Sequence, residues 1–411
     1  AQAQILCPRP SIAFTGMALL FALPFPEKAR SAFCMRPPFS LPPKMASHRA
    51  PRVSRCAAAS DSALGNAVAA AARKAGGAAA VHSKALAIVA MVAARACSRL
   101  SKQIATWEVR GASVEEVRQK NASGDEQKPL DLVADALLTG AFEQSEVVGL
   151  LASEEREDPC VLGSGTGPLV VAMDPLDGSR NIECSIPTGT IFCAFGRTDD
   201  GVHDDACQEV RMLAQNAADT LLLGGYCLYS SATVLVLAVR GGGVSQWVFD
   251  AAHEEWLCVT KQTELPLRGQ IYSLNDGRYF DWPKGLQQYI DAVRSGKGQT
   301  GKKYSARYVC SLVADFHRTL KYGGWAGNPR PHLRILYEGL PLALVAEESG
   351  GAASNGKCRF LSGPGSPEST AFSGADANLH ARASLFAGSL EDLIELESYR
   401  DVQQGTANYD V

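Results

Sequence analysis

The chain has 411 residues, of which 46% are hydrophobic and 20% are charged, and its formal net charge at pH 7 is -3. These values are typical of a globular protein long enough to form two packed domains. The small net charge gives no reason to expect nucleic acid as a partner. No segment approaches the ~20 consecutive apolar residues that cross a bilayer, so we expect no membrane partner for the mature form.

Residues 1–60 differ in composition from the rest of the chain. Glu27 is their only acidic residue, against eight Lys and Arg residues, and Ala, Ser and Pro are frequent. This composition predicts a disordered organelle transit peptide; an ordinary disordered tail is the alternative. The apolar run Met17 to Phe25 is short enough to be a signal-peptide core, as import into a plastid with extra membranes requires.

The first half of the remaining sequence predicts helices followed by two buried strands. The Ala-rich stretch 62–118 favours two helices broken near Gly76-Gly77, and a polar loop with Asp125 precedes a helix from Pro129 to Phe142. Asp131 lies in the first turn of that helix. The apolar run Val147 to Ala152 predicts a strand that ends in Ser153-Glu154-Glu155. A second run, Leu169 to Met173, predicts a strand that ends at Asp174, because Pro175, Gly178 and Asn181 form turns.

The second half predicts further strands and helices up to a polar tail. We expect strands at 190–195, 233–239, 244–249, 256–260, 271–274 and 333–337, and helices starting at 221 and over 285–293, 304–324 and 341–350. Residues 199–219 are expected to be irregular. The predicted domain limits are 62–264 for an N-terminal domain with the acidic residues, 265–398 for a C-terminal domain and 399–411 for the tail.

Acidic residues follow three of the predicted strands, at Glu154-Glu155, at Asp174 with Asp177, and at Glu338. Alone, Asp-Pro and Asp-Gly pairs are also common in simple turns. Two carboxylates at ~4 Å repel by about 4 kcal/mol at an effective dielectric constant near 20, so convergent acids need cations or protons. Oxygen ligands of this kind suit Mg²⁺ or Mn²⁺. The amides of Gly178 and Ser179 can face an anion, which indicates a metal ion holding a phosphate.

Several sequence blocks, in register over about residues 90–398, resemble fructose-1,6-bisphosphatase. They are SEE, VVAMDPLDGSRNIECSIPTGTIF, IYSLNDG, SARYVCSLVADFHRTLKYGG and ILYEGLPLALVAEESGG. The resemblance implies a mixed α/β (α+β) layered sugar-phosphatase fold, with two sheets sandwiched by helices, in the superfamily of inositol monophosphatase. It also implies Mg²⁺-dependent hydrolysis of the 1-phosphate of fructose 1,6-bisphosphate, in the plastid stroma, in the Calvin cycle or gluconeogenesis.

The resemblance also implies roles for individual residues. Those implied to bind Mg²⁺, with Mn²⁺ as a possible substitute, are Glu154, Glu155, Asp174, Asp177, Glu338 and the carbonyl of Leu176. Those implied to help a water molecule attack phosphorus are Asp125, Asp131 and Glu155. Those implied to bind the sugar bisphosphate are Asp177, Gly178, Ser179, Arg180, Asn275, Arg307, Tyr308 and His332. In the family the residue matching Arg307 reaches the 6-phosphate across a subunit boundary, so a homo-oligomer, a dimer or tetramer, is expected.

The chain departs from the family pattern at four places. Arg180 replaces a small residue beside the 1-phosphate, and WAGNPRPHLR is shorter than the family's sugar-binding loop. Cys207 is the one cysteine in the region of the redox insertion, so light activation through thioredoxin is not expected. Pro168-Leu169 replaces a Lys-Tyr pair of the nucleotide site.

Two alternatives to the fructose-1,6-bisphosphatase interpretation are a sedoheptulose-1,7-bisphosphatase and a non-catalytic regulatory relative. Inositol monophosphatase is a poorer match, because it shares DPxDG but not the blocks around Asn275 and Arg307.

Overall fold

The computed structural model describes residues 61–110, 119–120, 126–197, 205–361 and 378–404, all within one compact unit, residues 53–411. The predicted transit peptide, Asp125 and the end of the tail lie outside the described residues. Across the described chain, no helix combines the length and apolar character needed to cross a bilayer.

The larger sheet has eight strands and carries most of the acidic residues named above. In spatial order they are β10 (Glu255–Thr260), β9 (Gly243–Asp250), β8 (Thr233–Val239), β7 (Leu221–Tyr229), β6 (Thr188–Gly196), β5 (Leu169–Asp177), β3 (Val148–Ser153) and β4 (Cys160–Val161). Strands β3 and β5 are parallel, and the other neighbours are antiparallel. The parallel pair therefore places Glu154 and Asp174 at the same edge.

The smaller sheet has five strands and contributes the other wall of the site. In spatial order they are β12 (Ser305–Ala306), β11 (Ile271–Ser273), β13 (Trp325–Arg334), β15 (Arg382–Gly388) and β14 (Ala352–Ser354). Strand β11 is parallel to β12 and β13, whereas β15 runs antiparallel to β13 and β14. A separate two-stranded ribbon joins β1 (Gln119–Lys120) and β2 (Glu126–Gln127).

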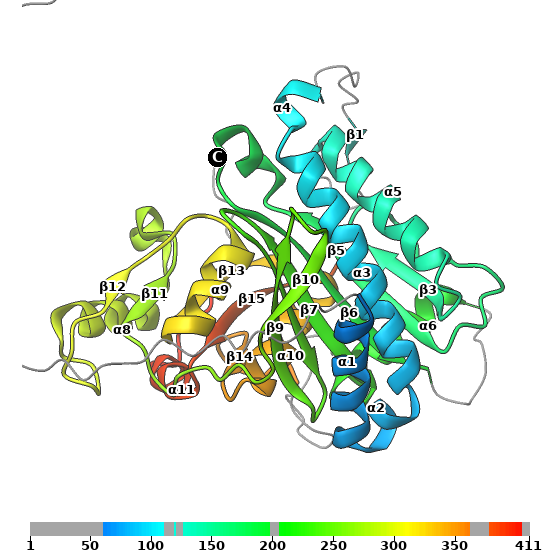
Figure 1. The fold of residues 1–411 in the computed structure, drawn as a ribbon. Coiled ribbons are helices and arrows are strands. Elements are labelled where there is room, and N and C mark those ends of the chain that lie inside the picture. The colour runs from blue at the N-terminus through cyan, green and yellow to red at the C-terminus, as the bar shows by residue number, and fades with distance from the viewer. Residues whose placement is uncertain (1–60, 111–118, 121–125, 198–204, 362–377, 405–411) are drawn as a thin grey trace, which may run out of the picture. The chain divides into compact units, whose positions relative to one another are not determined.

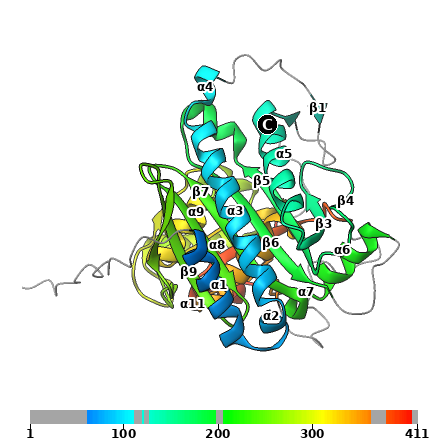
Figure 2. The same cartoon turned by 45° about the vertical axis from the view of Figure 1, so that its right-hand side comes forward.

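Helices cover both sheets, which gives alternating layers (Figures 1 and 2). On the outer face of the larger sheet lie α1 (Asp61–Ala75), α3 (Ser83–Ile104) and α5 (Pro129–Glu143). Between the sheets lie α9 (Leu312–Tyr322) and α10 (Leu340–Glu348). Behind the smaller sheet lie α8 (Lys284–Ser295) and α11 (Leu390–Ser398). The predicted layered fold, two sheets sandwiched by helices, is confirmed.

The remaining short elements connect these layers. They are α2 (Gly77–Val81), α4 (Trp107–Arg110), α6 (Ala206–Gln215), α7 (Ala217–Thr220), the 3₁₀ turns η2 (Ser179–Cys184) and η3 (Asp276–Asp281), and the π-helical turn η4 (Ile335–Gly339).

Strand β5 shows why an unbroken apolar run forms a central strand. Leu169, Val171 and Met173 pack under the outer helices, while Val170 and Ala172 face the layer between the sheets. Because both faces are covered, the strand needs no alternation of apolar and polar residues. The prediction that β5 ends at Asp174 is wrong: it continues to Asp177 through a register shift against β6. The irregularity accommodates Pro175, which has no amide to donate.

Four other sequence predictions are wrong. Residues 221–229 form buried strand β7 rather than the start of a helix, because a wholly apolar run does not distinguish the two. Residues 206–220 contain α6 and α7 within a segment predicted to be irregular. Ser305–Ala306 pairs with β11 in a segment predicted to lack strands. The predicted strand 333–337 ends at Arg334, and η4 follows, so Glu338 lies on a helical turn.

Helix α9 carries a histidine whose burial has a measurable consequence. His317 Nδ1 lies 2.8 Å from Tyr226 Oη, and burial lowers the pKa of His317 to about 4. The unfolded chain binds the proton below about pH 6.5, whereas the native chain does not until about pH 4. Relative to His317→Gln, the wild type should therefore lose about 2 kcal/mol of unfolding free energy between pH 7 and pH 5. Urea denaturation at both pH values checks this; equal losses in the two proteins would contradict it.

Candidate active site

A cavity of about 370 Å³ is lined by residues of both sheets and of the layer between them. From the larger sheet come the end of β3, the end of β5 and the start of η2. From the smaller sheet come β11 and β13, and the start of α9 and turn η4 complete the wall. The predicted site residues in this lining are Asp131, Glu154, Glu155, Asp174, Leu176, Asp177, Gly178, Ser179, Arg180, Tyr308, His332 and Glu338.

Three carboxylates meet in the cavity, although Glu338 is 164 residues from Asp174 in the chain. Asp174, Asp177 and Glu338 each place one oxygen so that the three atoms lie within 4.8 Å of one another. The Asp174 side chain is fixed by its Oδ1, which accepts a hydrogen bond from the Leu176 amide at 3.0 Å. Asp177 Oδ2 accepts one from the Val313 amide, at the start of α9, at 3.3 Å.

Burial makes the ionised form of these acids costly. It raises the pKa of Asp177 to about 6 and that of Glu338 to about 7. Burial also raises the pKa of Asp174 and of Glu154 well above the usual range, with a smaller contribution from neighbouring carboxylates. A group of carboxylates in this state is ready to take up protons or a cation.

Arg334, at the end of β13, is the main residue of this site that sequence reasoning missed. Its Nη1 lies 2.9 Å from Glu154 Oε1, and its backbone amide donates to Glu338 Oε2 at 2.5 Å. Only 7% of Arg334 is exposed, and its charge lowers the pKa of Glu154 and Glu338 against the effect of burial. A signal was present: Arg334 is a single charge between apolar Leu333 and Ile335 in a predicted buried strand.

The first turn of η2 forms the wall beside the acids. Gly178 has φ of 75°, which a residue with a side chain rarely adopts, and η2 starts directly after it. Ser179 Oγ donates to Asp131 Oδ2 at 3.2 Å, and the Lys128 amide donates to the same oxygen at 2.8 Å. Burial raises the pKa of Asp131. Arg180 lies in the same lining with its side chain exposed.

The donor set fits a hard divalent cation. Asp131 Oδ1 and Glu154 Oε2 are buried and have no hydrogen-bond partner among the described residues. Both residues line the cavity that holds the three convergent carboxylates. The convergent donor atoms are all carboxylate oxygens, which are ligands that Mg²⁺ and Mn²⁺ prefer.

Two predicted substrate-binding residues lie outside the lining of this cavity. Asn275 and Arg307 are exposed and are not part of the cavity lining. The Arg307 amide donates to the Tyr272 carbonyl at 2.9 Å, which extends the pairing of β12 with β11. The role of Arg307 across a subunit boundary stays a prediction, as does the role of Asp125, which lies outside the described residues.

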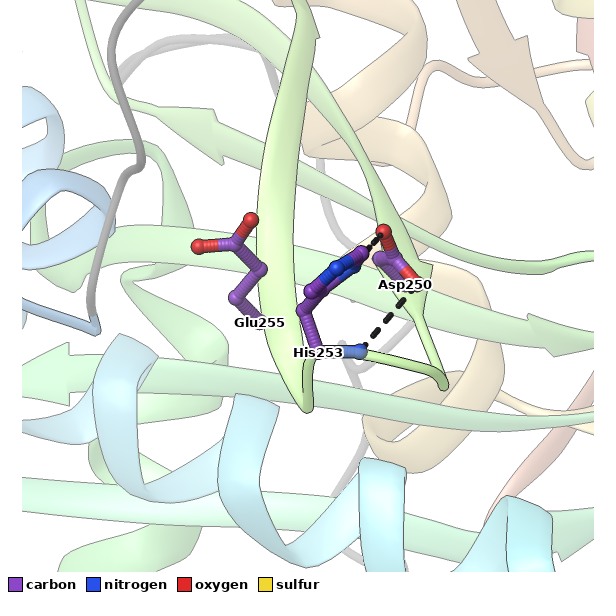
Figure 3. A group of neighbouring side chains, drawn as sticks. All are labelled: Asp250, His253 and Glu255. Atoms are coloured by element: carbon purple, nitrogen blue, oxygen red, sulfur yellow. Dashed lines mark hydrogen bonds and ion pairs between the residues drawn. The ribbon is translucent and has the colours of Figure 1, made fainter.

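A second group of possible metal ligands lies at the turn between β9 and β10 (Figure 3). Asp250 Oδ2 is 2.8 Å from His253 Nδ1, and Asp250 Oδ1 accepts from the Ala252 amide at 2.9 Å. The side chain of Glu255 is the third member. These contacts are those of an exposed turn stabilised by its aspartate, which raises the pKa of His253.

The layered fold and the acidic cavity define an α/β protein of the sugar-phosphatase type. The family models described as "Fructose-1-6-bisphosphatase, N-terminal domain" and "Fructose-1-6-bisphosphatase, C-terminal domain" match residues 74–261 and 265–401. The chain therefore belongs to the fructose-1,6-bisphosphatase family.

Individual relatives agree with this assignment. The chain is 37% identical over 295 residues to fructose-1,6-bisphosphatase 1, chloroplastic, of Arabidopsis thaliana, covering 68% of each chain. It is 37% identical over 296 residues to the chloroplastic fructose-1,6-bisphosphatase of Spinacia oleracea, again covering 68% of each. It is also similar to the crystal structure of Leishmania major fructose-1,6-bisphosphatase in holo form, with a TM-score of 0.68 and 28% identity, over 77% of this chain and 94% of that one.

Proposed function

We propose that this protein hydrolyses the 1-phosphate of fructose 1,6-bisphosphate to give fructose 6-phosphate and inorganic phosphate. The observation that carries the proposal is the convergence of Asp174, Asp177 and Glu338 in a cavity beside the Gly178–Ser179 turn. Membership of the family, whose relatives carry the name of this activity, supports the same substrate.

Mg²⁺ is the proposed cofactor, and Mn²⁺ is a possible substitute. The residues that would hold it are Glu154, Glu155, Asp174, Asp177, Glu338 and the carbonyl of Leu176, all in the cavity lining. When bound, a divalent cation neutralises phosphoryl oxygens and so lowers the barrier to displacement.

The chain's own groups supply orientation and proton transfer. The amides of Gly178 and Ser179 start a helical turn at the cavity and would hold the 1-phosphate. Asp131 is fixed through Oδ2, while its buried Oδ1 has no hydrogen-bond partner within the described part of the chain. This oxygen is the proposed acceptor of the proton from the attacking water, and the raised pKa of Asp131 favours that role. Glu155 and Asp125 are the other proposed helpers.

The remaining predicted residues would bind the rest of the substrate. Arg180, Tyr308 and His332 line the cavity and are proposed to contact its phosphates or sugar. Arg307 is exposed, and it is proposed to reach the 6-phosphate of a substrate bound by a neighbouring subunit of a homo-oligomer. Asn275, which is also exposed, is proposed to contact the same phosphate. The stromal location and the transit peptide, residues 1–60, are likewise proposals that the chloroplastic relatives support. The domain boundary at 264–265 also stays a proposal.

A phosphate-release assay tests the proposed activity. We expect Mg²⁺-dependent release from fructose 1,6-bisphosphate and slower release from sedoheptulose 1,7-bisphosphate. Faster release from the seven-carbon substrate would favour the sedoheptulose-1,7-bisphosphatase alternative. No release from either substrate, with Mg²⁺ or with Mn²⁺, would favour a non-catalytic regulatory relative.

AMP is expected to inhibit this protein weakly or not at all. Pro168-Leu169 occupies the place of the family's Lys-Tyr pair, and Leu169 is fully buried at the start of β5, so neither side chain offers a polar group to a nucleotide. Initial rates measured over a range of AMP concentrations at fixed substrate check this. Strong inhibition at micromolar AMP would show the expectation to be wrong.

A further inference from the structure

Among the nine cysteines of the described residues, Cys310 is the one that lines the cavity. It is exposed and directly precedes Ser311, the N-cap of α9. Its φ is 59°, a left-handed conformation that is uncommon outside glycine. Asn181 Nδ2, on η2, donates to the Cys310 carbonyl at 2.8 Å. The thiol therefore has a defined place on the cavity wall.

The thiol lies beside a group that the proposed reaction uses. Tyr308, proposed to contact the substrate, places its hydroxyl 3.3 Å from Cys310 Sγ. Three residues after Cys310, the Val313 amide donates to Asp177 Oδ2 at 3.3 Å. A substituent on Cys310 Sγ would therefore meet the Tyr308 hydroxyl, close in sequence to the amide that fixes Asp177.

Independent evidence shows that the cavity is built for a ligand. Asp131 and Glu154 line it and are 4% and 8% exposed, and Asp131 Oδ1 and Glu154 Oε2 have no hydrogen-bond partner among the described residues. Buried polar atoms are rarely left without a partner, so a bound group must satisfy them. At about 370 Å³ the cavity has the size of a small-molecule site, so a peptide-sized substituent on Cys310 that enters it would take up space that the ligand needs.

We propose that Cys310 is a modification site, at which a mixed disulfide with a low-molecular-weight disulfide excludes the phosphorylated ligand from the cavity. Cys310 loses its proton to solvent, and the thiolate sulfur attacks one sulfur of the small disulfide. The new S–S bond forms as the old one breaks, and the departing half takes up a proton as a thiol. Cys310 is oxidised and the small disulfide is reduced, and added thiol reverses the reaction. The identity of the ligand rests on the proposed function, whereas the reaction at the thiol does not.

The test treats the full chain with oxidised glutathione and measures three quantities. Peptide mass spectrometry gives the fraction modified at Cys310, calorimetry with Mg²⁺ gives the fraction that binds inorganic phosphate, and the assay gives phosphate release. We expect phosphate binding and release to fall in proportion to the modification at Cys310, and dithiothreitol to restore both. Bound phosphate with Mg²⁺ should slow the modification.

Matched variants separate Cys310 from the other thiols. Cys310→Ser, and Cys310→Gly, which suits the left-handed backbone, should each keep their own untreated level of phosphate binding after treatment. Cys184→Ser, which removes an exposed thiol outside the cavity lining, should remain as sensitive as wild type. An unmodified Cys310, modification without loss of phosphate binding, or sensitive Cys310 variants would overturn the inference.

The outcomes also distinguish this inference from the proposed function. Untreated protein that binds phosphate but releases none from fructose 1,6-bisphosphate would refute the function, while loss of phosphate binding on modification would still support the inference. Untreated protein that neither binds phosphate nor releases it from fructose 1,6-bisphosphate would refute both.

Discussion

Replacing Asp174 by Asn is expected to lower the rate of phosphate release at least ~10³-fold, which corresponds to about 4 kcal/mol of transition-state stabilisation. The change removes one of three acidic groups whose oxygens lie within 4.8 Å of one another, and with it a proposed ligand for the cation. The amide oxygen of Asn can still accept the hydrogen bond from Leu176 that Asp174 Oδ1 accepts, so the end of β5 should keep its structure. Phosphate release at saturating substrate and Mg²⁺ measures the effect.

A matched substitution controls for loss of an acid as such. Asp250→Asn changes a carboxylate of the exposed β9–β10 turn, outside the cavity lining, and should leave the rate near that of wild type. Circular dichroism and thermal melting of both variants test whether the fold is kept. An Asp174→Asn protein with a normal rate of phosphate release would refute the proposed mechanism.

Replacing Arg334 by Met is expected to lower the free energy of unfolding by about 3 kcal/mol without Mg²⁺. The guanidinium is buried and pairs with Glu154, so its removal leaves that carboxylate without its cationic partner. Mg²⁺ should restore part of the lost stability, because it binds the native acids and not the unfolded chain. Urea denaturation with and without Mg²⁺ measures both effects.

A double variant shows whether the pair itself causes the loss. Adding Glu154→Gln removes the unpaired charge, so Arg334→Met with Glu154→Gln should be less destabilised than the sum of the single variants. Additive losses would mean that the 2.9 Å contact contributes little and that Arg334 acts through packing.

The sequence located site residues correctly where a chemically suitable residue followed an apolar run that predicts a strand. The acids after β3 and β5 and the glycine at 178 could be located because each follows an apolar run at a point that turn-forming residues mark. Glu338 was located in the same way, as the acid after the predicted strand 333–337, but no local pattern encodes its nearness to Asp174. Sequence alone gave no distance between Glu338 and the larger sheet.

The sequence predictions that were wrong or missing concern residues whose surroundings come from distant parts of the chain. Strand β7 is buried on both faces, so its nine residues lack the alternation that separates strand from helix. Arg334 was missed because the sequence does not show which acid would pair with an arginine inside an apolar run. The structure shows that the partner is Glu154, which follows a strand of the larger sheet. Glu338 was placed at a strand end, whereas a π-helical turn orients it.

The convergent acids of the cavity come from the larger sheet and from the turn η4 that follows the smaller sheet, and this has a consequence for distant substitutions. The distance between Asp174 and Glu338 depends on how the larger sheet packs against the helices between the sheets. Helix α10 forms much of this packing through its contact with β7. A methyl group on Gly224, in β7, would lie 2.9 Å from the Pro341 carbonyl of α10 and push the layers apart. The rate of phosphate release should therefore fall when a substitution shifts the layers, even if the substituted residue does not contact the substrate.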